Sequence, residues 1–538
     1  MDDLFDHLRY LIIDDFEQMR TSFRGMLTRV GARDIETCSN GEQGLKALSQ
    51  HNYDVVICDY NLGDGKDGQQ VLEESRYLGY LGHACCFFLI TAESNMPLVL
   101  GALEQQPDEY MIKPIKPDVL HHRLAAVLKR KRQLKVIDQA LMDGDKAGAV
   151  RLCEEQRDKD LKKRLYLAKL QSELCIDLER YDEAESIYLQ VLKIRKFPWA
   201  SFGLGKIEYH KGEMEKAAAC FQGLIKENPL YLEVYDWLAL VLAEQGEKRE
   251  AQRLLQQAVK YSPKLVRRQR LLGQLAQENG DMEVAERAYK AAVRWGENSC
   301  FVKPDEYRHL AEIYQSRGNN PKLLRLLSDG CKRFEGRPAA KIILLSRLAR
   351  AKRHINKAES IDDCLQEITL LVREQKEIFA AEDLLMVADD LFQLSCHDQA
   401  RLLLGVLLGN HHDDEEWTSR VRELMHAHEQ GHAADELIGQ CKQALKRVHS
   451  DCVKLFQQGA MEQAIELLNE VVDQYPGNRT MVLMSVSAMI DFMRDHGVEQ
   501  TYHFRCRYSL NQLLERNRQD ETAGKYLHQL EHLLVCPE

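Results

Sequence analysis

The sequence lacks three features that would have fixed its class at once: a long apolar run, cysteines in CxxC spacing and an excess of positive charge. No apolar stretch approaches the ~20 residues needed to span a membrane, so we expect no membrane insertion. The 15 cysteines include no CxxC spacing and are scattered, which favours reduced thiols in the cytoplasm. A net charge of -11 argues against a dedicated nucleic-acid binder. Residues 1–6 are acidic and show no signal-peptide pattern.

The first 120 residues contain short, continuous apolar runs separated by segments of helical character. Runs of this kind are typical of strands buried on both faces of a parallel sheet. The runs are Leu11–Ile13, Val55–Cys58, Cys86–Ile90 and Glu109–Ile112. Helices are predicted at about 16–30, 41–51, 68–79, 97–106 and 117–134. This alternation predicts an α/β domain whose strands all end at one edge of the sheet, where ligands bind.

Polar residues follow each of these runs. Asp14 and Asp15 follow the first, Asp59 the second, Thr91 the third and Lys113 the fourth. Crowded carboxylates favour a hard divalent cation such as Mg²⁺. A lysine and a hydroxyl opposite them would stabilise charge on a phosphoryl group, and one carboxylate could act as the nucleophile. The pattern therefore predicts a phosphoryl-transfer site.

On these residues, the stretch from about 8 to 130 resembles the receiver domain of two-component response regulators. The resemblance implies a flavodoxin-like, five-stranded parallel sheet. It makes Asp59 the phosphoacceptor and Asp14 with Asp15 the metal-binding pair. It also assigns the backbone carbonyl of Asn61 to Mg²⁺, the expected cofactor, and makes a sensor histidine kinase the expected phosphodonor.

The resemblance assigns further roles around the phosphoryl group. Thr91 and Lys113 would contact that group, and the small Ala92 would leave room for it. Tyr110 matches the aromatic switch residue of the family. Pro114 is expected to follow a cis peptide bond, which costs little before proline.

Two features concern the lifetime of the phosphoryl group. Asn61 and Glu93 occupy the positions that tune hydrolysis in this family, and the pair resembles that of chemotaxis-type receivers, so we expect turnover within minutes. Gly63 stands where the family usually has proline. The loop 61–68 also looks one residue longer than usual, and its three glycines predict a mobile loop beside Asp59.

The rest of the chain repeats itself. Gly212, Gly246 and Gly280 are spaced 34 residues apart. The same period relates Ala217, Ala251 and Ala285, then Leu204, Leu238 and Leu272, then Phe221, Leu255 and Tyr289. A 34-residue period is typical of the tetratricopeptide family, which this region resembles. Glycine supplies the left-handed turn after the first helix of a repeat, and alanine lets the two helices approach closely.

The predicted architecture is a receiver at 1–130 followed by an all-α, tetratricopeptide-like helical-repeat solenoid at 131–538. Its clearest repeats lie at 198–330. The repeat register is unclear at 337–375, at 410–450 and after 480. Stacked repeats of this kind bury one another's apolar faces.

Three other motifs have simpler interpretations. His428–His432 matches HExxH, the zinc-protease motif, but Gly431 interrupts the helix that the motif needs, so we expect an exposed turn. His411–Glu416 is interpreted as a solvated acidic loop. Lys129–Arg132 ends a predicted helix, so it is interpreted as a solvated face placed favourably for the helix dipole.

The function expected from the sequence is that of a bacterial, cytoplasmic response regulator and not of an enzyme. Asp59 would accept a phosphoryl group, and the repeats would bind an unidentified protein in a phosphorylation-dependent way. The alternative is an auxiliary phosphoryl sink, or a kinase-binding inhibitor or scaffold, whose repeats bind regardless of phosphorylation.

Overall fold

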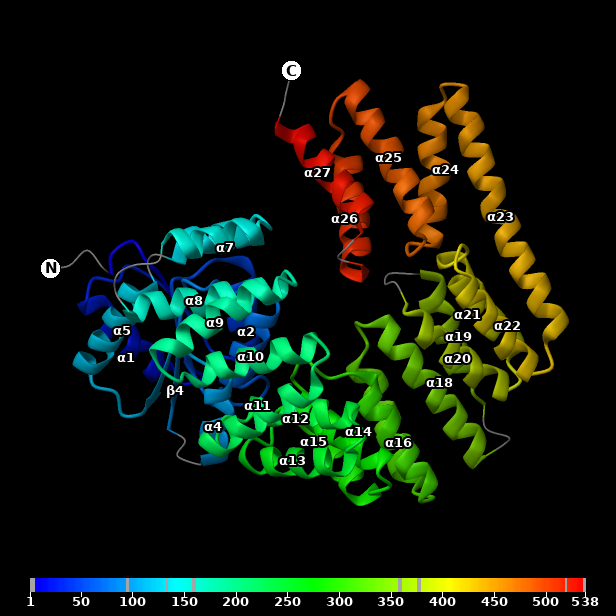
Figure 1. The fold of residues 1–538 in the computed structure, drawn as a ribbon. Coiled ribbons are helices and arrows are strands. Elements are labelled where there is room, and N and C mark those ends of the chain that lie inside the picture. Colours follow the sequence, from blue (N-terminus) through cyan, green and yellow to red (C-terminus); the bar gives the residue numbers. More distant parts are fainter. Residues whose placement is uncertain are drawn as a thin grey trace. The chain divides into compact units, whose positions relative to one another are not determined.

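The chain folds into two compact units, Met1–Val302 and Lys303–Glu538 (Figure 1). The fold is taken from a computed structural model. The structure describes residues 5–92, 96–131, 134–156, 161–356, 360–374, 379–517 and 520–535. Each unit has its own hydrophobic core, and each is described by itself below.

The first unit begins with a five-stranded parallel sheet in the order β2-β1-β3-β4-β5. The strands are β1 (Arg9–Ile13), β2 (Asp34–Cys38), β3 (Val55–Asp59), β4 (Cys86–Thr91) and β5 (Glu109–Ile112). Every residue of the central strands β3 and β4 is buried, as their apolar runs predict. The sequence did not locate β2, an edge strand in which only Cys38 is buried.

Helices cover both faces of this sheet. They are α1 (Glu17–Arg29), α2 (Gly41–Gln50), α3 (Gly68–Tyr77), α4 (Met96–Glu104) and α5 (Pro117–Lys131), close to the predicted ranges. Side chains alternate across the sheet, so Tyr10 and Ile12 share one core with α1 and α5. Leu11 and Ile13 share the other core with α2, α3 and α4.

The remainder of the first unit is a series of antiparallel helix pairs. The helices are α6 (Lys135–Met142), α7 (Lys146–Glu155), α8 (Leu161–Asp177), α9 (Tyr181–Ile194), α10 (Pro198–His210), α11 (Met214–Glu227), α12 (Glu233–Glu244), α13 (Lys248–Tyr261), α14 (Val266–Glu278) and α15 (Met282–Gly296). Gly212, Gly246 and Gly280 have φ values of 79°, 86° and 78°, which confirms their predicted left-handed turns.

The second unit is entirely helical in its described residues. It comprises α16 (Pro304–Ser316), α17 (Asn320–Arg333), α18 (Pro338–Ile355), α19 (Asp362–Glu374), α20 (Ala381–Gln393), α21 (His397–Asn410), α22 (Glu415–Ala427), α23 (Gly431–Gln457), α24 (Met461–Gln474), α25 (Arg479–His496), α26 (Gln500–Arg516) and α27 (Glu521–Val535). Ser395 and Glu429 occupy left-handed turns with φ near 60° where other repeats have glycine. The replacement of glycine by Glu429 hides the repeat signal around 410–450.

The HExxH match does not lie on one helix. His428 ends α22, Glu429 is in the left-handed turn and Gly431 begins α23, so the two histidines lack the one-turn spacing that a shared metal needs. His428 instead contacts Asp389 at 2.7 Å. Among the described residues, no helix is both long enough and apolar enough to cross a membrane.

The basic end of α5 is only partly solvated, which corrects the interpretation of 129–132. Lys131 is buried, and its Nζ donates to the carbonyl oxygen of Cys85 and, at 2.7 Å, to Asp108. From α6, the carboxylate of Asp138 accepts the backbone amides of His83 and Ala84 at 2.8 and 2.6 Å. These contacts attach the first repeat helix to the loop before β4.

Close helix packing makes Gly203 of α10 intolerant of a side chain. A Cβ atom there would lie 2.1 Å from Cζ of Tyr188 on α9, whereas one at Gly223 of α11 would meet no described atom within 4 Å. Gly203→Ala should therefore lower the free energy of unfolding by about 1–3 kcal/mol. Gly223→Ala should raise it by about 0.5–1 kcal/mol because alanine favours helix. Thermal unfolding of both variants, followed by circular dichroism, checks this packing; equal melting temperatures would contradict it.

Candidate functional site

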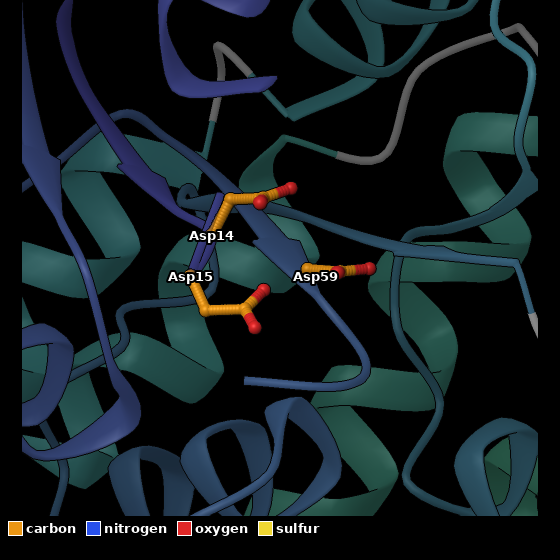
Figure 2. A group of neighbouring side chains, drawn as sticks. All are labelled: Asp14, Asp15 and Asp59. Atoms are coloured by element: carbon orange, nitrogen blue, oxygen red, sulfur yellow. The ribbon is translucent and has the colours of Figure 1, made fainter. Parts of the chain in front are cut away.

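Three carboxylates meet at the edge of the sheet where β1 and β3 end (Figure 2). One ligand oxygen from each of Asp14, Asp15 and Asp59 lies within 4.8 Å of the other two. Asp14 and Asp59 are buried, with 1% and 6% of their surface exposed, and Asp15 is half-buried. The described ranges contain no other group of this kind. The topology thus brings together the residues that the strand ends predict.

The backbone fixes this cluster in place. The amide of Phe16 donates to Oδ1 of Asp14 at 2.9 Å, and Arg20 donates to the carbonyls of Asp14 and Asp15 at 2.7 and 3.0 Å. Behind Asp59, a Cβ atom on Gly68 would lie 2.1 Å from the Asp59 carbonyl oxygen. Only glycine therefore allows α3 to begin this close to the end of β3.

Lys113 places a positive charge against two of the carboxylates. Its Nζ lies 3.1 Å from Oδ2 of Asp14 and 3.0 Å from Oδ2 of Asp59. Burial works against the charged ammonium, but the hydrogen bonds and charges of Asp59 and Asp14 outweigh it and raise the pKa of Lys113. The Lys113–Pro114 peptide bond is cis, as expected.

The carboxylate of Asp59 is costly to ionise here. Burial raises its pKa to about 6, although Lys113 and the amide of Tyr60 pull the value down. The neighbouring charge of Asp14 also raises the pKa. The site consequently favours additional positive charge beside Asp59.

The donor set fits Mg²⁺. Oδ1 of Asp15 is buried and has no hydrogen-bond partner among the described residues, so it keeps a lone pair available for a ligand. Three carboxylates, completed by water, are suitable ligands for this hard cation. The loop after Asp59 lies next to the Asp15 carboxylate, since a Cβ atom on Gly63 would lie 3.6 Å from Oδ2 of Asp15. Asn61, whose carbonyl is the remaining predicted ligand, is exposed on this loop.

The other predicted residues lie on β4 and β5 or directly follow β4. Thr91 is buried at the end of β4, and Ala92 follows it in an exposed position. Tyr110 of β5 is half-buried and packs against the core shared with α2, α3 and α4. Glu93 lies outside the described residues, so its predicted role in hydrolysis stays a prediction.

Sequence reasoning missed a second set of residues, which reach the site from the repeats. Lys264, between α13 and α14, donates to Asp67 at 2.9 Å and to the Tyr60 hydroxyl at 3.1 Å. Asn298, after α15, donates to the carbonyl of Gly65 at 2.7 Å. The loop that was expected to be mobile is thus held by contacts from residues about 200 positions away. The basic stretch 264–270 was the available signal, but nothing in it names its acidic partners.

Comparison with solved structures finds receiver domains. The receiver domain of Francisella response regulator 1452 is 22% identical in sequence, and the match covers 23% of this chain and 98% of that domain with a TM-score of 0.21. A CheY-like receiver domain from Methanospirillum hungatei is 21% identical in sequence, and the match covers 23% of this chain and 97% of that domain with a TM-score of 0.22.

Curated relatives match the same region. The transcriptional regulatory protein AfsQ1 of Streptomyces coelicolor is 36% identical over 120 residues, which cover 22% of this chain and 51% of AfsQ1. The chain therefore spans about half the length of that relative. The chemotaxis protein CheY-3 of Vibrio cholerae is 27% identical over 124 residues, which cover 23% of this chain and 94% of CheY-3.

Family models match both parts of the chain. The response regulator receiver domain model matches residues 10–125. Two tetratricopeptide repeat models match residues 174–231 and 238–299, and residues 453–478. The chain therefore contains a response regulator receiver domain in its N-terminal part and tetratricopeptide repeats in the remainder.

Proposed function

We propose that the protein is a response regulator that accepts a phosphoryl group on Asp59 and uses its repeats to bind a protein partner. The observation that carries this proposal is the cluster of Asp14, Asp15 and Asp59 with Lys113 set between two of them. A sensor histidine kinase is the proposed donor, and the cytoplasm is the proposed compartment.

The proposed chemistry is a direct displacement at phosphorus. A carboxylate oxygen of Asp59 attacks the phosphorus of a phosphohistidine, the P–N bond breaks, and the imidazole of the kinase leaves with the electron pair. When bound by the carboxylates, Mg²⁺ would neutralise charge on the phosphoryl oxygens. Lys113 would transfer from Asp59 to the new phosphoryl group, and the Thr91 hydroxyl would donate to the same group. Asn61 and Glu93 are proposed to limit the lifetime of the acyl phosphate to minutes.

A phosphorylation-dependent output is favoured over a passive phosphoryl sink. The support is the set of contacts from Lys264 and Asn298 to the loop that follows Asp59. A sink whose repeats bind regardless of phosphorylation needs no such connection. In addition, α5 ends at Lys131 and α6 begins at Lys135, so the receiver continues almost directly into the repeats.

Phosphoryl acceptance is tested with a small-molecule donor. Acetyl phosphate and Mg²⁺ should shift the wild-type protein on a phosphate-affinity gel, and Asp59→Ala should abolish the shift because the nucleophile is gone. Asp64→Ala is the matched control, since Asp64 is an exposed carboxylate of the same loop. Modification of the Asp59→Ala protein at the wild-type rate would rule out Asp59 as the acceptor.

Metal binding is tested without any phosphoryl chemistry. Asp15→Asn should weaken Mg²⁺ binding, measured by titration calorimetry, by at least about tenfold, which corresponds to about 1.4 kcal/mol. The amide keeps the shape of the side chain but removes its charge. Asp64→Asn should bind like wild type. Equal affinities for all three proteins would place the metal elsewhere.

The output is tested by partner capture. Full-length protein is immobilised with beryllofluoride and Mg²⁺, and an immobilised Asp59→Ala variant is compared with it. A partner retained in only one state is expected, because a phosphorylation-gated adaptor must distinguish the two states. Capture of the same partner to the same extent in both would favour the constitutive scaffold instead.

A further inference from the structure

The loop that follows Asp59 is held by the repeats at several points. This Asp59 loop comprises residues 60–67. Besides donating to Tyr60 and Asp67, the Lys264 ammonium lies 5.0 Å from the centre of the Tyr60 ring. Asn298 donates to the carbonyl of Gly65 and accepts from Nζ of Lys66 through its own carbonyl. Both ends of the glycine-containing stretch are thus fixed by residues of the repeats.

The receiver helices α3 and α4 meet the same face of the repeats. Arg267 of α14 pairs with Glu73 of α3 at 3.3 Å. Arg268, whose side chain is fully buried, donates to Glu104 of α4 and to Asp236 of α12. An apolar contact lies beside these ion pairs, where Leu100 of α4 packs against Leu232, Tyr235 and Ala258.

Charge is divided unequally across this contact. The repeats contribute the cations Lys264, Arg267 and Arg268, and the receiver contributes the carboxylates Asp67, Glu73 and Glu104. Opposite charges on two surfaces fix the register of docking and suppress other arrangements. A second apolar contact joins the Tyr77 ring of α3 to the Phe301 ring, whose centres are 4.9 Å apart. A contact in which ion pairs accompany apolar contacts is typical of the polar interfaces across which domains move.

We propose that Lys264, Arg267 and Arg268 form a receiver-binding surface on the repeats, which holds the Asp59 loop while Asp59 is unmodified and releases it when Asp59 is phosphorylated. This inference rests on the proposed function. It identifies the first occupant of the repeat surface as the chain's own receiver.

The direction follows from linkage. The observed contacts form while Lys113 bridges Asp14 and Asp59. The backbone carbonyl of Asn61, on the Asp59 loop, would be a ligand of bound Mg²⁺. A phosphoryl group on Asp59 would draw Lys113 away from these carboxylates and would add negative charge where the loop begins. Both changes act on the loop that Lys264 and Asn298 hold. Contacts that favour the unmodified loop must be weakened when Asp59 carries a phosphoryl group or binds its mimic beryllofluoride. Removing these contacts must therefore strengthen the binding of the mimic to the same degree.

The repeats can tolerate this release. When the receiver leaves, Arg268 loses Glu104 but keeps Asp236, to which two of its nitrogen atoms donate at 2.7 Å. The guanidinium of Arg268 is then not left buried without a counter-charge, which is the outcome that would make opening prohibitively costly. Glu104 and Glu73 return to water with the receiver.

The test uses the full chain and compares Lys264→Met with Lys260→Met. Lys260 is an exposed lysine near the end of α13, so the second variant makes the same chemical change away from the contact. Lys264→Met should strengthen binding of beryllofluoride with Mg²⁺ by about fivefold or more, the lower end of typical coupling. Lys260→Met should bind like wild type. Equal affinities for the two variants would overturn the proposal.

Hydrogen exchange on the wild type gives an independent readout. Loading with beryllofluoride and Mg²⁺ should speed exchange in α4 and in the α13–α14 connection, while the helices of the second unit stay unchanged. Slower or unaltered exchange there would overturn the release, even if Asp59 accepts the ligand normally. If the wild type fails to bind beryllofluoride and is not modified by acetyl phosphate, the proposed function itself fails.

Exchanging the charges of one ion pair distinguishes loss of the contact from misfolding of a variant. Glu73→Arg and Arg267→Glu, made separately, should each raise beryllofluoride affinity as Lys264→Met does. The double variant restores an opposite-charge pair and should return toward wild-type affinity. Two single effects that simply add in the double variant would overturn the role of this ion pair.

Discussion

The structure depends on a small volume in which three carboxylates are forced together beside one lysine. Burial of Asp59 next to Asp14 makes its negative charge unfavourable, and Lys113 compensates for only part of this cost. The sheet imposes the crowding, because the parallel strands β1 and β3 are neighbours and end at the same edge. Any event that changes the charge at Asp59 therefore changes the balance of forces on the loop that leaves it.

The elements that the sequence predicted are those whose signals are local. Apolar runs in the sequence marked β1, β3, β4 and β5, and the polar residues that follow them marked the site. The edge strand β2 was not located because its side chains are mostly half-exposed and polar. Likewise, the 34-residue glycine period identified repeats only where glycine occupies the left-handed turn. Glu179, Ser395 and Glu429 adopt that conformation without being glycine, so the glycine period does not mark those turns.

Contacts between distant segments could not be predicted. The side chain of Lys131 was expected to be solvated at a helix end, yet it is buried against Asp108 and Cys85. Nothing local to Lys264 reveals that Asp67, 197 positions earlier, is its partner. Such pairings depend on how the successive helix pairs between the receiver and α14 stack on one another, which is a property of the accumulated helix packing and not of any short sequence pattern.

The short junction between α5 and α6 has a consequence for competition. The receiver is joined to the surface it covers through this junction and the helices α6–α13, so it acts as a tethered ligand, with an effective concentration on the order of millimolar. A free protein present at ~1 μM would start with a disadvantage of about a thousandfold on that surface. The tether thus sets a threshold: a molecule that binds there must either be abundant, bind very tightly, or arrive after the receiver has left.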